Sequence, residues 1–426
     1  MPKPRDDPRN LLTELFNCAV AAADPMKVIP GNLPPRPTGR LVVIGAGKAS
    51  ARMAEAVEAH CGPCEGIVIT RYGYSRPCKG IEIVEAAHPI PDAAGVAATR
   101  RILDMVQGLG PDDLVLSLIS GGGSALLCAP ADELTLEDKI QANAALLSSG
   151  VPISGINLIR KRLSAVKGGR LAAACYPAHV VNLIISDVPG DDPALIASGP
   201  TVPDTNSSNL MEIVEQYGLD LSPAILAALA KSQQPILAND LRMQNIETKI
   251  VAAPSSSLRA AAKLVGSRGY DVQILGDALE GEASDLGAKH ARLAMDIQSK
   301  LKPGSDPVLL LSGGECTVTH SYEDAVKGVG GPNAEFVLSA AITLNGAPGI
   351  HILACDTDGV DGAAEIAGAC AGPTTLKLAN GAGISAKNKL EIHDSHGFFE
   401  VVDSQIITGP TMTNVNDFRT VLIGSG

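Results

Sequence analysis

Aromatic residues are scarce in this chain of 426 residues, which has no tryptophan, six tyrosines and five phenylalanines. Proteins that bind nucleic acid stack bases on aromatic rings and neutralise the phosphates with basic residues. In this chain 46 aspartates and glutamates outnumber 34 lysines and arginines, which gives a net charge of −12. The composition therefore excludes nucleic acid as the expected partner.

Long hydrophobic runs are missing too. No run approaches the roughly 18 apolar residues that a membrane-spanning helix needs. The first ten residues are polar and contain proline, without the apolar centre of a signal peptide. We therefore expect a soluble, cytoplasmic protein with no membrane partner.

Cysteine and histidine do not form a recognisable metal or disulfide pattern. The nine cysteines are scattered, and a chain of this length does not need disulfides. Cys61-Gly-Pro-Cys64 has the spacing of a redox pair, but it lies between helical segments, so we interpret it as a turn. His393 and His396 have no further cluster to complete a metal site, so we expect a solvated loop there.

Apolar and glycine residues are plentiful. The chain is 45% apolar and has 44 glycines, where average usage predicts about 30. Short apolar runs followed by glycine-rich or acidic loops and helical segments recur along it. In the first half the runs are Leu41–Ile44, Gly66–Thr70, Leu114–Ser120 and Val180–Ser186, and in the second half Lys249–Ala252, Asp271–Leu275, Pro307–Ser312 and Ile350–Ala354. This alternation predicts α/β structure with buried, mainly parallel strands.

We expect two α/β domains. Residues 1–240 would form a larger Rossmann-like domain with a mainly parallel sheet, and residues 241–426 a smaller one. This prediction leaves open whether the C-terminal tail packs against the first domain. Ligands of open α/β sheets bind beyond the carboxyl ends of the strands, so the loops at those ends are where function is expected.

The first such loop contains Gly45-Ala-Gly-Lys48. Strand, G-x-G and helix follow in the order of a dinucleotide site, but the third glycine position is Ser50. The next strand ends in Thr70-Arg71 instead of an acid for the ribose. Lys48 at a helix N-terminus is equally consistent with a bound phosphate or with an exposed lysine in a tight turn.

The second loop, Gly121-Gly-Gly-Ser124, is more specific. Gly121, Gly122 and Gly123 leave successive amides open to an anion, and Ser124 can cap the helix or bind phosphate. The Walker A sequence G-x-x-x-x-G-K-[ST] does not occur. Any nucleotide is therefore handled outside the P-loop family.

A basic segment follows at Ile156–Arg170. Its apolar residues have helical spacing, so we expect an amphipathic helix, whose basic side is either solvated or attracts an anionic substrate. Both interpretations stay open. For function we favour Arg160 and Lys167, because the helix is expected to end beside them at Gly168 and Gly169.

Carboxylates gather after the strand expected at Val180–Ser186. Asp187, Asp191 and Asp192 lie within six residues and can hold Mg²⁺ or provide a base toward a hydroxyl. A turn explains Asp192, which precedes Pro193, better than it explains Asp187 at the strand terminus. We assign Asp187 and Asp191 as candidate metal ligands.

The loops of the second half carry similar groups. They contain Ser312–Glu315, Gly328–Glu335, Asp356–Gly362 and Thr408–Asp417. Amides and a lysine for phosphate charge, carboxylates for a metal and an aspartate for the acceptor are the parts of a phosphoryl-transfer site. We assign Glu315, Asn333 and Asn414 to substrate or phosphate binding and Asp358 to the metal.

These motifs resemble a known family. The strings are GAGKAS, SGGGSALL, INLIRKRLSAVKGGRLA, SDVPGDDPALIASGPT, SGGECTVT, GGPNAEF, DTDGVDGA and TGPTMTNVNDF. From about residue 8 to residue 422 the chain is similar to class II glycerate kinases, the glycerate 2-kinase family with a MOFRL-type C-terminal domain. Some members carry the label hydroxypyruvate reductase.

The resemblance implies a reaction, its cofactors and its location. ATP and Mg²⁺ would support transfer of the γ-phosphoryl group to the 2-hydroxyl of D-glycerate, giving 2-phosphoglycerate, in a cleft between the two domains. The family's essential lysine falls on Lys48 and its essential aspartate on Asp187. The partners would be small molecules, and a homodimer is one assembly that we consider.

One motif departs from the family. Many members read Gly-Gly-Arg-Asn-Gln-Glu where this chain has Pro332 in the place of the arginine and Val329 before the glycines. Either another cation, such as Lys327 or Arg160, takes that role, or substrate handling differs. The alternatives to a kinase are an NAD(P)H-dependent hydroxypyruvate reductase and a sugar-acid sensor that binds without reacting.

Overall fold

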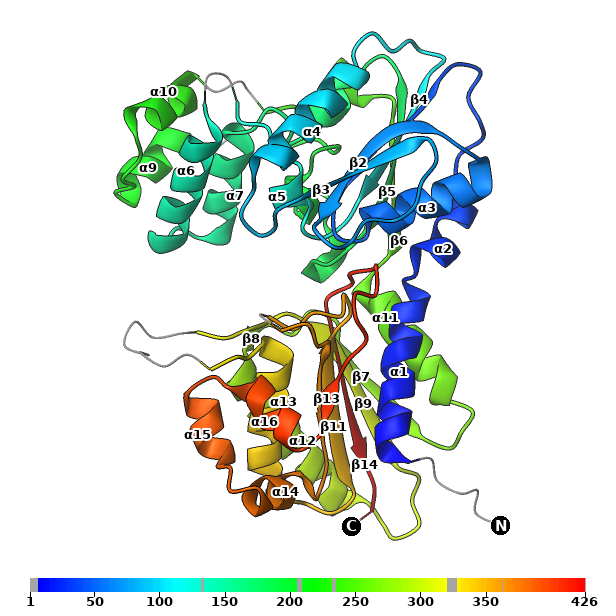
Figure 1. The fold of residues 1–426 in the computed structure, drawn as a ribbon, viewed down its shortest axis with the longest axis vertical. Coiled ribbons are helices and arrows are strands. Elements are labelled where there is room, and N and C mark those ends of the chain that lie inside the picture. The colour runs from blue at the N-terminus through cyan, green and yellow to red at the C-terminus, as the bar shows by residue number, and fades with distance from the viewer. Residues whose placement is uncertain are drawn as a thin grey trace. The chain divides into compact units, whose positions relative to one another are not determined.

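The computed structural model describes residues 7–131, 134–204, 209–231, 235–319, 328–362 and 364–425. These residues belong to two compact units. The first unit comprises residues 25–187 and 191–251, and the second comprises residues up to 24, residues 188–190 and residues from 252 onward. Each unit is built on a six-stranded sheet with helices packed against it (Figure 1).

The sheet of the first unit has the strand order β3-β2-β1-β4-β5-β6. Its strands are β1 Leu41–Ala46, β2 Glu65–Arg71, β3 Ile81–Ala86, β4 Leu114–Ile119, β5 His179–Ile185 and β6 Ile246–Ala252. β1 pairs in parallel with β2 and β4, and the pairs β2–β3 and β4–β5 are also parallel. The Rossmann-like parallel sheet expected from the sequence is therefore confirmed.

The helices of this unit are α2 Pro25–Val28, α3 Ser50–Cys61, α4 Ala93–Met105, α5 Gly123–Leu126, α6 Leu136–Ser148, α7 Ile153–Arg162, α8 Arg170–Ala174, α9 Leu210–Gln216 and α10 Pro223–Lys231. Of these, α6, α7, α9 and α10 pack on one another around a separate apolar core beside the sheet. Ala98 and Ile102 of α4 share a core with Val42 and Ile44 of β1. α3 packs against β1, β2 and β4. The fully apolar strands are explained by this burial.

Two strands of the first sheet were not anticipated in their observed places. β3 was not predicted, because Glu82 and Glu85 interrupt its apolar residues, and as an edge strand it is only partly buried. The strand predicted at Lys249–Ala252 exists as part of β6, but it closes the first sheet instead of opening the second. An edge position tolerates its alternating polar residues.

The second unit contains a mixed sheet in the order β13-β12-β11-β14-β9-β7 and a two-stranded β8–β10 pair. Its strands are β7 Asp271–Gly276, β8 Gly281–Glu282, β9 Val308–Gly314, β10 Cys316–Thr317, β11 Ile350–Asp356, β12 Gly368–Ala371, β13 Gln405–Ile406 and β14 Asp417–Ile423. β7 and β9 are parallel, whereas β14 runs antiparallel to both β9 and β11. The second α/β domain is confirmed, and its sheet differs from the parallel one of the first unit.

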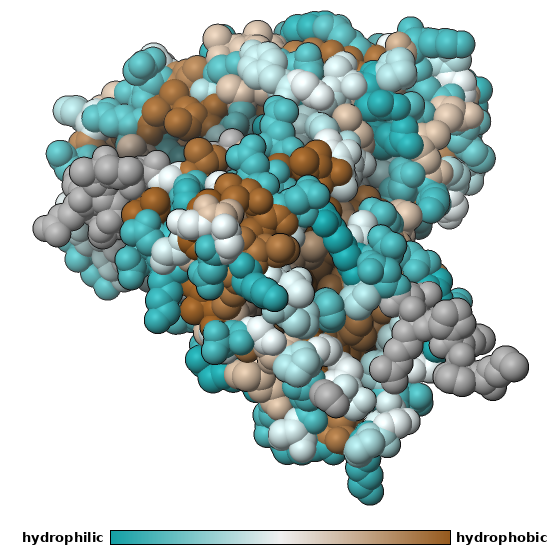
Figure 2. Space-filling view, turned by 60° about the horizontal axis from the view of Figure 1, so that its bottom comes forward, coloured by the Kyte–Doolittle hydropathy of each residue, from teal (hydrophilic) through white to brown (hydrophobic). Residues whose placement is uncertain are grey.

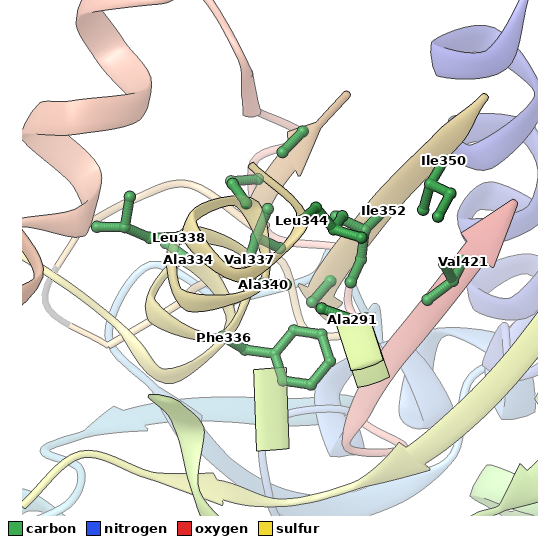
Figure 3. Packing of buried hydrophobic residues seen from close by; sticks show 14 of the residues in the cluster. Ala291, Ala334, Phe336, Val337, Leu338, Ala340, Leu344, Ile350, Ile352 and Val421 are labelled. Carbon is green, nitrogen blue, oxygen red and sulfur yellow. The ribbon is translucent and has the colours of Figure 1, made fainter. Parts of the chain in front are cut away.

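The helices of the second unit are α1 Pro8–Ala22, α11 Pro254–Val265, α12 Ala283–Lys300, α13 Pro332–Leu344, α14 Thr375–Gly381, α15 Ala386–Glu391 and α16 Ser395–Val401. In Figure 3 the side chains of α13 gather with Ile350 and Ile352 of β11 and Val421 of β14. Phe336 and Val337 are fully buried in this core.

The N-terminal helix α1 packs with the second unit although it opens the chain. Leu11, Leu15 and Phe16 share a core with Leu258 of α11 and Phe418 of β14. The compact units thus differ from the ranges 1–240 and 241–426 at α1 and at β6. That domain division stays a prediction of the sequence.

Hydrophilic side chains are spread over the face that Figure 2 shows, with groups of hydrophobic residues between them. Among the described helices none combines the length and the apolar character that crossing a membrane requires.

Candidate functional site

Two strand-end loops of the first unit meet at the point where the sheet order reverses. β1 and β4 are neighbours in the sheet, but the connections from them lead to opposite sides. The amide of Lys48, after β1, donates to the carbonyl of Gly121, after β4, over 2.8 Å. Such a reversal point is where ligands of doubly wound sheets bind. Lys48 and Gly121, expected at one site from the sequence, are therefore adjacent.

Gly47 and Gly122 are required by the geometry of these loops. A Cβ on Gly47, whose φ is +147°, would lie 2.1 Å from Ser120 Oγ. Gly122 has a φ of +78°, and a Cβ there would lie 3.1 Å from the ring of His88 and 3.2 Å from Lys48 Cγ. The bare Cα of Gly122 therefore lets Lys48 and His88 approach the loop closely.

Ser50, at the third glycine position of the dinucleotide motif, has a structural role. Its hydroxyl donates to the carbonyl of Leu118 over 3.0 Å and lies 3.1 Å from Ser120 Oγ. Ser120 Oγ also accepts from the amide of Ala49. This buried cluster joins the start of α3 to β4.

A cavity of about 310 Å³ lies beside the second loop. Three basic side chains line it, Lys139 of α6, Arg160 of α7 and Lys167, and we call it the cationic cavity. Gly122 and Ser124 line it as well, so four expected residues, these two with Arg160 and Lys167, come together there. Apolar side chains, His88 and Asn143 complete its walls.

Lys167 is buried and fixed in place. Its ammonium donates to both the carbonyl and the hydroxyl of Ser124. Burial lowers the pKa of Lys167 well below its ordinary value, and the nearby Lys139 lowers it further. Ser124 Oγ in turn lies 2.9 Å from Ser198 Oγ. Lys167 thus ties the glycine loop to the segment that follows α7.

The amphipathic helix expected over Ile156–Arg170 is shorter than predicted, because α7 ends at Arg162. Ser164 Oγ accepts from the amides of Val166 and Lys167, and a turn follows, with Gly169 at a φ of +80°. A local hydroxyl acceptor competes with helical hydrogen bonds in this way.

Most basic residues of the segment Ile156–Arg170 do not lie on a solvent-exposed face of a helix. Lys161 and Arg162 are buried, and both lie within ion-pair distance of the buried Asp204, at 3.5 and 3.9 Å. Burial lowers the pKa of the half-buried Arg160, whose Nε donates to Asn143. The sequence could not show which of these side chains are paired, because Asp204 lies 43 residues beyond Lys161 in the chain.

The acidic loop after β5 presents Asp187 and Asp191. Asp187 is half-buried directly beyond the strand. Asp191 has a φ of +54°, and its Oδ1 is buried with no hydrogen-bond partner among the described residues. Asp192 accepts from the amide of Ala194 over 2.9 Å, which agrees with the turn expected for it. An orphan carboxylate oxygen at Asp191 suits a cation.

The expected site residues of the second unit differ in exposure and in hydrogen bonding. Glu315 is exposed between β9 and β10. Asn333 is buried, and its Nδ2 donates to Asp417 over 2.7 Å. Asn414 is buried and accepts from the amide of Asn416. The fully buried Asp358 accepts from the amide of Val360 over 2.8 Å.

A buried polar network at the N-terminus of α13 was not recognised in the sequence. Asp361 accepts from the amides of Asn333 and Ala334 over 2.9 and 2.8 Å. Arg419 and Asp417 form an ion pair of 2.5 Å in which Arg419 is fully buried. Burial raises the pKa of Asp417. The sequence had placed Asn333, Asp361 and Asp417 in three separate loops, and nothing in it indicated that they meet or that Arg419 joins them.

The motif His393–His396 is not the solvated loop that was expected. His396 is 3% exposed on α16, and its Nε2 lies 3.3 Å from Asp361 Oδ2. His393 Nδ1 lies 2.9 Å from Glu335 Oε2. Packing of α16 against α13 buries His396, whereas His393, just before α16, is half-buried. At Cys61–Cys64 the chain turns as expected and both thiols are free, but the motif lies between α3 and the strand β2, not between two helices.

The structure describes Val329 and Pro332, the two positions at which family members carry the arginine that this chain lacks. Val329 is half exposed, and its amide donates to Asp394 Oδ1 over 3.1 Å. Pro332 is the first residue of α13. Lys327, one of the two substitutes considered, lies outside the described residues, and the other, Arg160, lines the cationic cavity.

Two family models match this chain. A domain of unknown function, DUF4147, matches residues 11–230, and the MOFRL family matches residues 308–417.

Curated proteins and a solved structure also match over nearly the whole chain. A provisionally named hydroxypyruvate reductase of Agrobacterium vitis is 49% identical over 98% of this chain and 94% of its own length. The D-glycerate 2-kinase of Thermotoga maritima is 36% identical over 97% and 98%. The crystal structure of a glycerate kinase from Thermotoga maritima aligns with a TM-score of 0.87 at 35% identity, over 98% of this chain and 99% of that one.

Proposed function

Because the chain belongs to the glycerate kinase family with a MOFRL domain, we propose that it is an ATP- and Mg²⁺-dependent glycerate 2-kinase. The chain is an enzyme of the class that transfers a phosphoryl group to an alcohol. The proposed acceptor is the 2-hydroxyl of D-glycerate, and the products are 2-phosphoglycerate and ADP.

The observation that carries this proposal is the contact between Lys48 and the glycine loop. The amide of Lys48 and the carbonyl of Gly121 are hydrogen-bonded at the reversal point of the sheet. An ammonium beside glycines with little steric bulk suits an anionic phosphate. We assign Lys48 and the loop Gly121–Ser124 to the phosphate groups of ATP and of the transition state.

The chemistry needs charge stabilisation and one proton acceptor. The bond between the γ-phosphorus and its bridging oxygen breaks, the oxygen of the 2-hydroxyl bonds to phosphorus, and ADP leaves. The hydroxyl proton passes to a carboxylate, which we assign to Asp187, half-buried beyond β5. Lys48 offsets the negative charge on the transferred group.

The described carboxylates could supply only part of the ligands of a magnesium ion. Among the described residues no group of three or more His, Cys, Asp or Glu side chains could hold a metal ion. Mg²⁺ is commonly held by one or two carboxylates together with substrate phosphates. The orphan Oδ1 of Asp191 suits this use, so Asp191 with Asp187 would hold the ion, which neutralises phosphate charge when bound. Asp358 stays a further proposed ligand.

We keep the remaining sequence-based assignments as parts of the proposal. Glu315, Asn333 and Asn414 would contact substrate or phosphate. Cytoplasmic location and a homodimer are also proposed, and light scattering of the purified protein tests the dimer.

The test is a kinase assay with ATP, Mg²⁺ and D-glycerate. We expect release of ADP and a product that enolase consumes directly, without a mutase. Failure to release ADP would contradict the kinase. Release of ADP without direct coupling to enolase would contradict transfer to the 2-hydroxyl.

The relatives named as hydroxypyruvate reductases favour a second candidate, an NAD(P)H-dependent reductase. Two features speak against a dinucleotide. Ser50 replaces the third glycine and is hydrogen-bonded to β4. β2 ends at Thr70-Arg71, and Thr70 donates to the carbonyl of Gly47 where an acid would bind the ribose. Oxidation of NADH in the presence of hydroxypyruvate, followed at 340 nm, tests this alternative; a binding protein without turnover would show neither reaction.

A further inference from the structure

The cationic cavity has an unusual balance of charge. It is lined by Lys139, Arg160 and Lys167, and no carboxylate lines it among the described residues. Its walls are largely apolar, with Ala142, Leu146 and Leu163 among them. Charged groups in such surroundings are normally paired, because burying an uncompensated charge is costly.

Lys139 is the residue for which this cost is clearest. Its Nζ is buried and has no hydrogen-bond partner among the described residues. It interacts with the buried thiol of Cys128, which is too weak an acceptor to balance an ammonium. Burial lowers the pKa of Lys139. An anion in the cavity would supply the negative partner that the described residues do not provide.

The other two cations are held by neutral groups. Arg160 Nε donates to Asn143 Oδ1, which fixes the plane of the guanidinium. Lys167 Nζ donates to the carbonyl and the hydroxyl of Ser124. Neither interaction neutralises a charge. The three basic groups are thus ordered around a space for which the described residues provide no counter-charge.

The volume of the cavity and the chemistry of its lining limit which ligands it can bind. The cavity volume of about 310 Å³ is at the lower end of the range of roughly 300–1,000 Å³ found for ligand pockets. It therefore suits a small acid better than a whole nucleotide. Planar carboxylates match a guanidinium. The phosphate groups are assigned to the neighbouring site formed by Lys48 and the glycine loop.

We propose that the cationic cavity binds the carboxylate of the acceptor acid and that Lys139, with Arg160, selects small hydroxy acids as acceptors. This inference rests on the proposed kinase function. Gly122 and Ser124 belong both to the glycine loop and to the cavity wall. An acid anchored in the cavity is therefore placed beside the loop that we assign to phosphate.

The experiment compares Lys139→Met with wild-type enzyme. Methionine keeps the length and removes the charge. We expect the KM for D-glycerate to rise roughly tenfold to a hundredfold, the effect of losing one charge-assisted hydrogen bond, while the KM for ATP changes less than about twofold. Lys139→Arg restores the charge and should recover much of the affinity. Lys79→Met, at an exposed lysine of the same unit, is the matched control and should behave as wild type.

Binding of D-glycerate without ATP, measured by calorimetry, separates this proposal from the kinase proposal. We expect wild type to bind and Lys139→Met to bind at least tenfold more weakly. If wild type binds but never releases ADP, the kinase fails and the cavity assignment stands. An unchanged KM and affinity for D-glycerate in Lys139→Met would overturn the cavity assignment alone. A raised KM for ATP with an unchanged KM for D-glycerate would also overturn it, because the cavity would then hold nucleotide phosphates.

Discussion

Lys48 and Arg419 show how differently a charged side chain is used in the two units. Lys48 lies half-buried beside glycines at the end of β1, where a substrate can reach it. Arg419 is fully buried in β14, paired with Asp417 and placed over the ring of Phe336 at 5.4 Å. We expect substitution of the first to affect turnover and substitution of the second to affect stability.

Lys48→Ala should lower kcat by about two to three orders of magnitude, because one positioned charge donor is removed from the transition state. The measurement is steady-state ADP release at saturating ATP and D-glycerate. Lys79→Ala, which removes an exposed lysine, serves as the control. A rate near that of wild type would show that Lys48 is only a turn residue.

Arg419→Met should lower the free energy of unfolding by about 3–5 kcal/mol, because it leaves the buried Asp417 without its cation. Urea denaturation followed by circular dichroism measures the loss. The control is Arg40→Met, since Arg40 and Glu65 form an ion pair with both side chains 47% exposed, worth at most about 1 kcal/mol. Equal losses in the two variants would contradict the structural role of Arg419.

At the scale of elements, one side chain joins the end of the helix α3 to the start of the strand β3. Glu58, near the end of α3, accepts from the amides of Gly80 and Ile81 at the start of β3, both over 2.7 Å. Burial opposes ionisation of Glu58, but the amides of Lys79, Gly80 and Ile81 outweigh it and lower the pKa. The edge strand β3 is thus anchored to α3 by a carboxylate.

Glu58→Gln should therefore lower stability by roughly 1.5–3 kcal/mol at pH 7, the range for hydrogen bonds to a charged group. The folded-state pKa lies below the ordinary glutamate value of 4.5, so the stabilisation is present above pH 4.5 and is lost as the pH falls through the folded-state pKa. Denaturation curves between pH 3 and 7 should show the difference between variant and wild type shrinking in that window. A difference independent of pH would contradict the ionised role.

At the scale of the whole molecule, the first described helix is part of the unit formed by the end of the chain. Phe16 of α1 lies 6.1 Å from Phe418 of β14, ring centre to ring centre, and both are buried. Stability of the second unit therefore depends on residues about 400 positions apart in the sequence.

Phe16→Ala should destabilise the second unit by about 3–5 kcal/mol, the usual cost of removing a buried aromatic side chain. Hydrogen exchange should accelerate in β11 and β14 while β1 and β4 keep wild-type protection. Ile102→Ala, in the core of the first unit, should give the opposite pattern. Uniform acceleration in both units would show that α1 does not act on the second unit alone.

The sequence by itself determined the strand-end loops, and with them much of the candidate site. Apolar runs that end in glycine or aspartate predicted β1, β4, β5, β9 and β11, because strands buried on both faces need continuous apolar residues. Gly121 and Ser124 were identified from local spacing, whereas Lys48 was chosen over an ordinary turn lysine only with the family resemblance. Edge strands such as β3 and β6 were missed or misplaced, since partial burial relaxes that pattern.

Only the tertiary structure decided which charged residues are buried and which of them meet. Lys139 on α6 carries no motif, yet packing places it in one cavity with Arg160 and Lys167. Asp417 and Arg419 look like surface residues in the sequence, but their mutual pairing allows β14 to lie inside the second sheet. Local spacing fixes backbone direction and apolar faces, whereas compensation of a charge depends on partners that are distant in the chain.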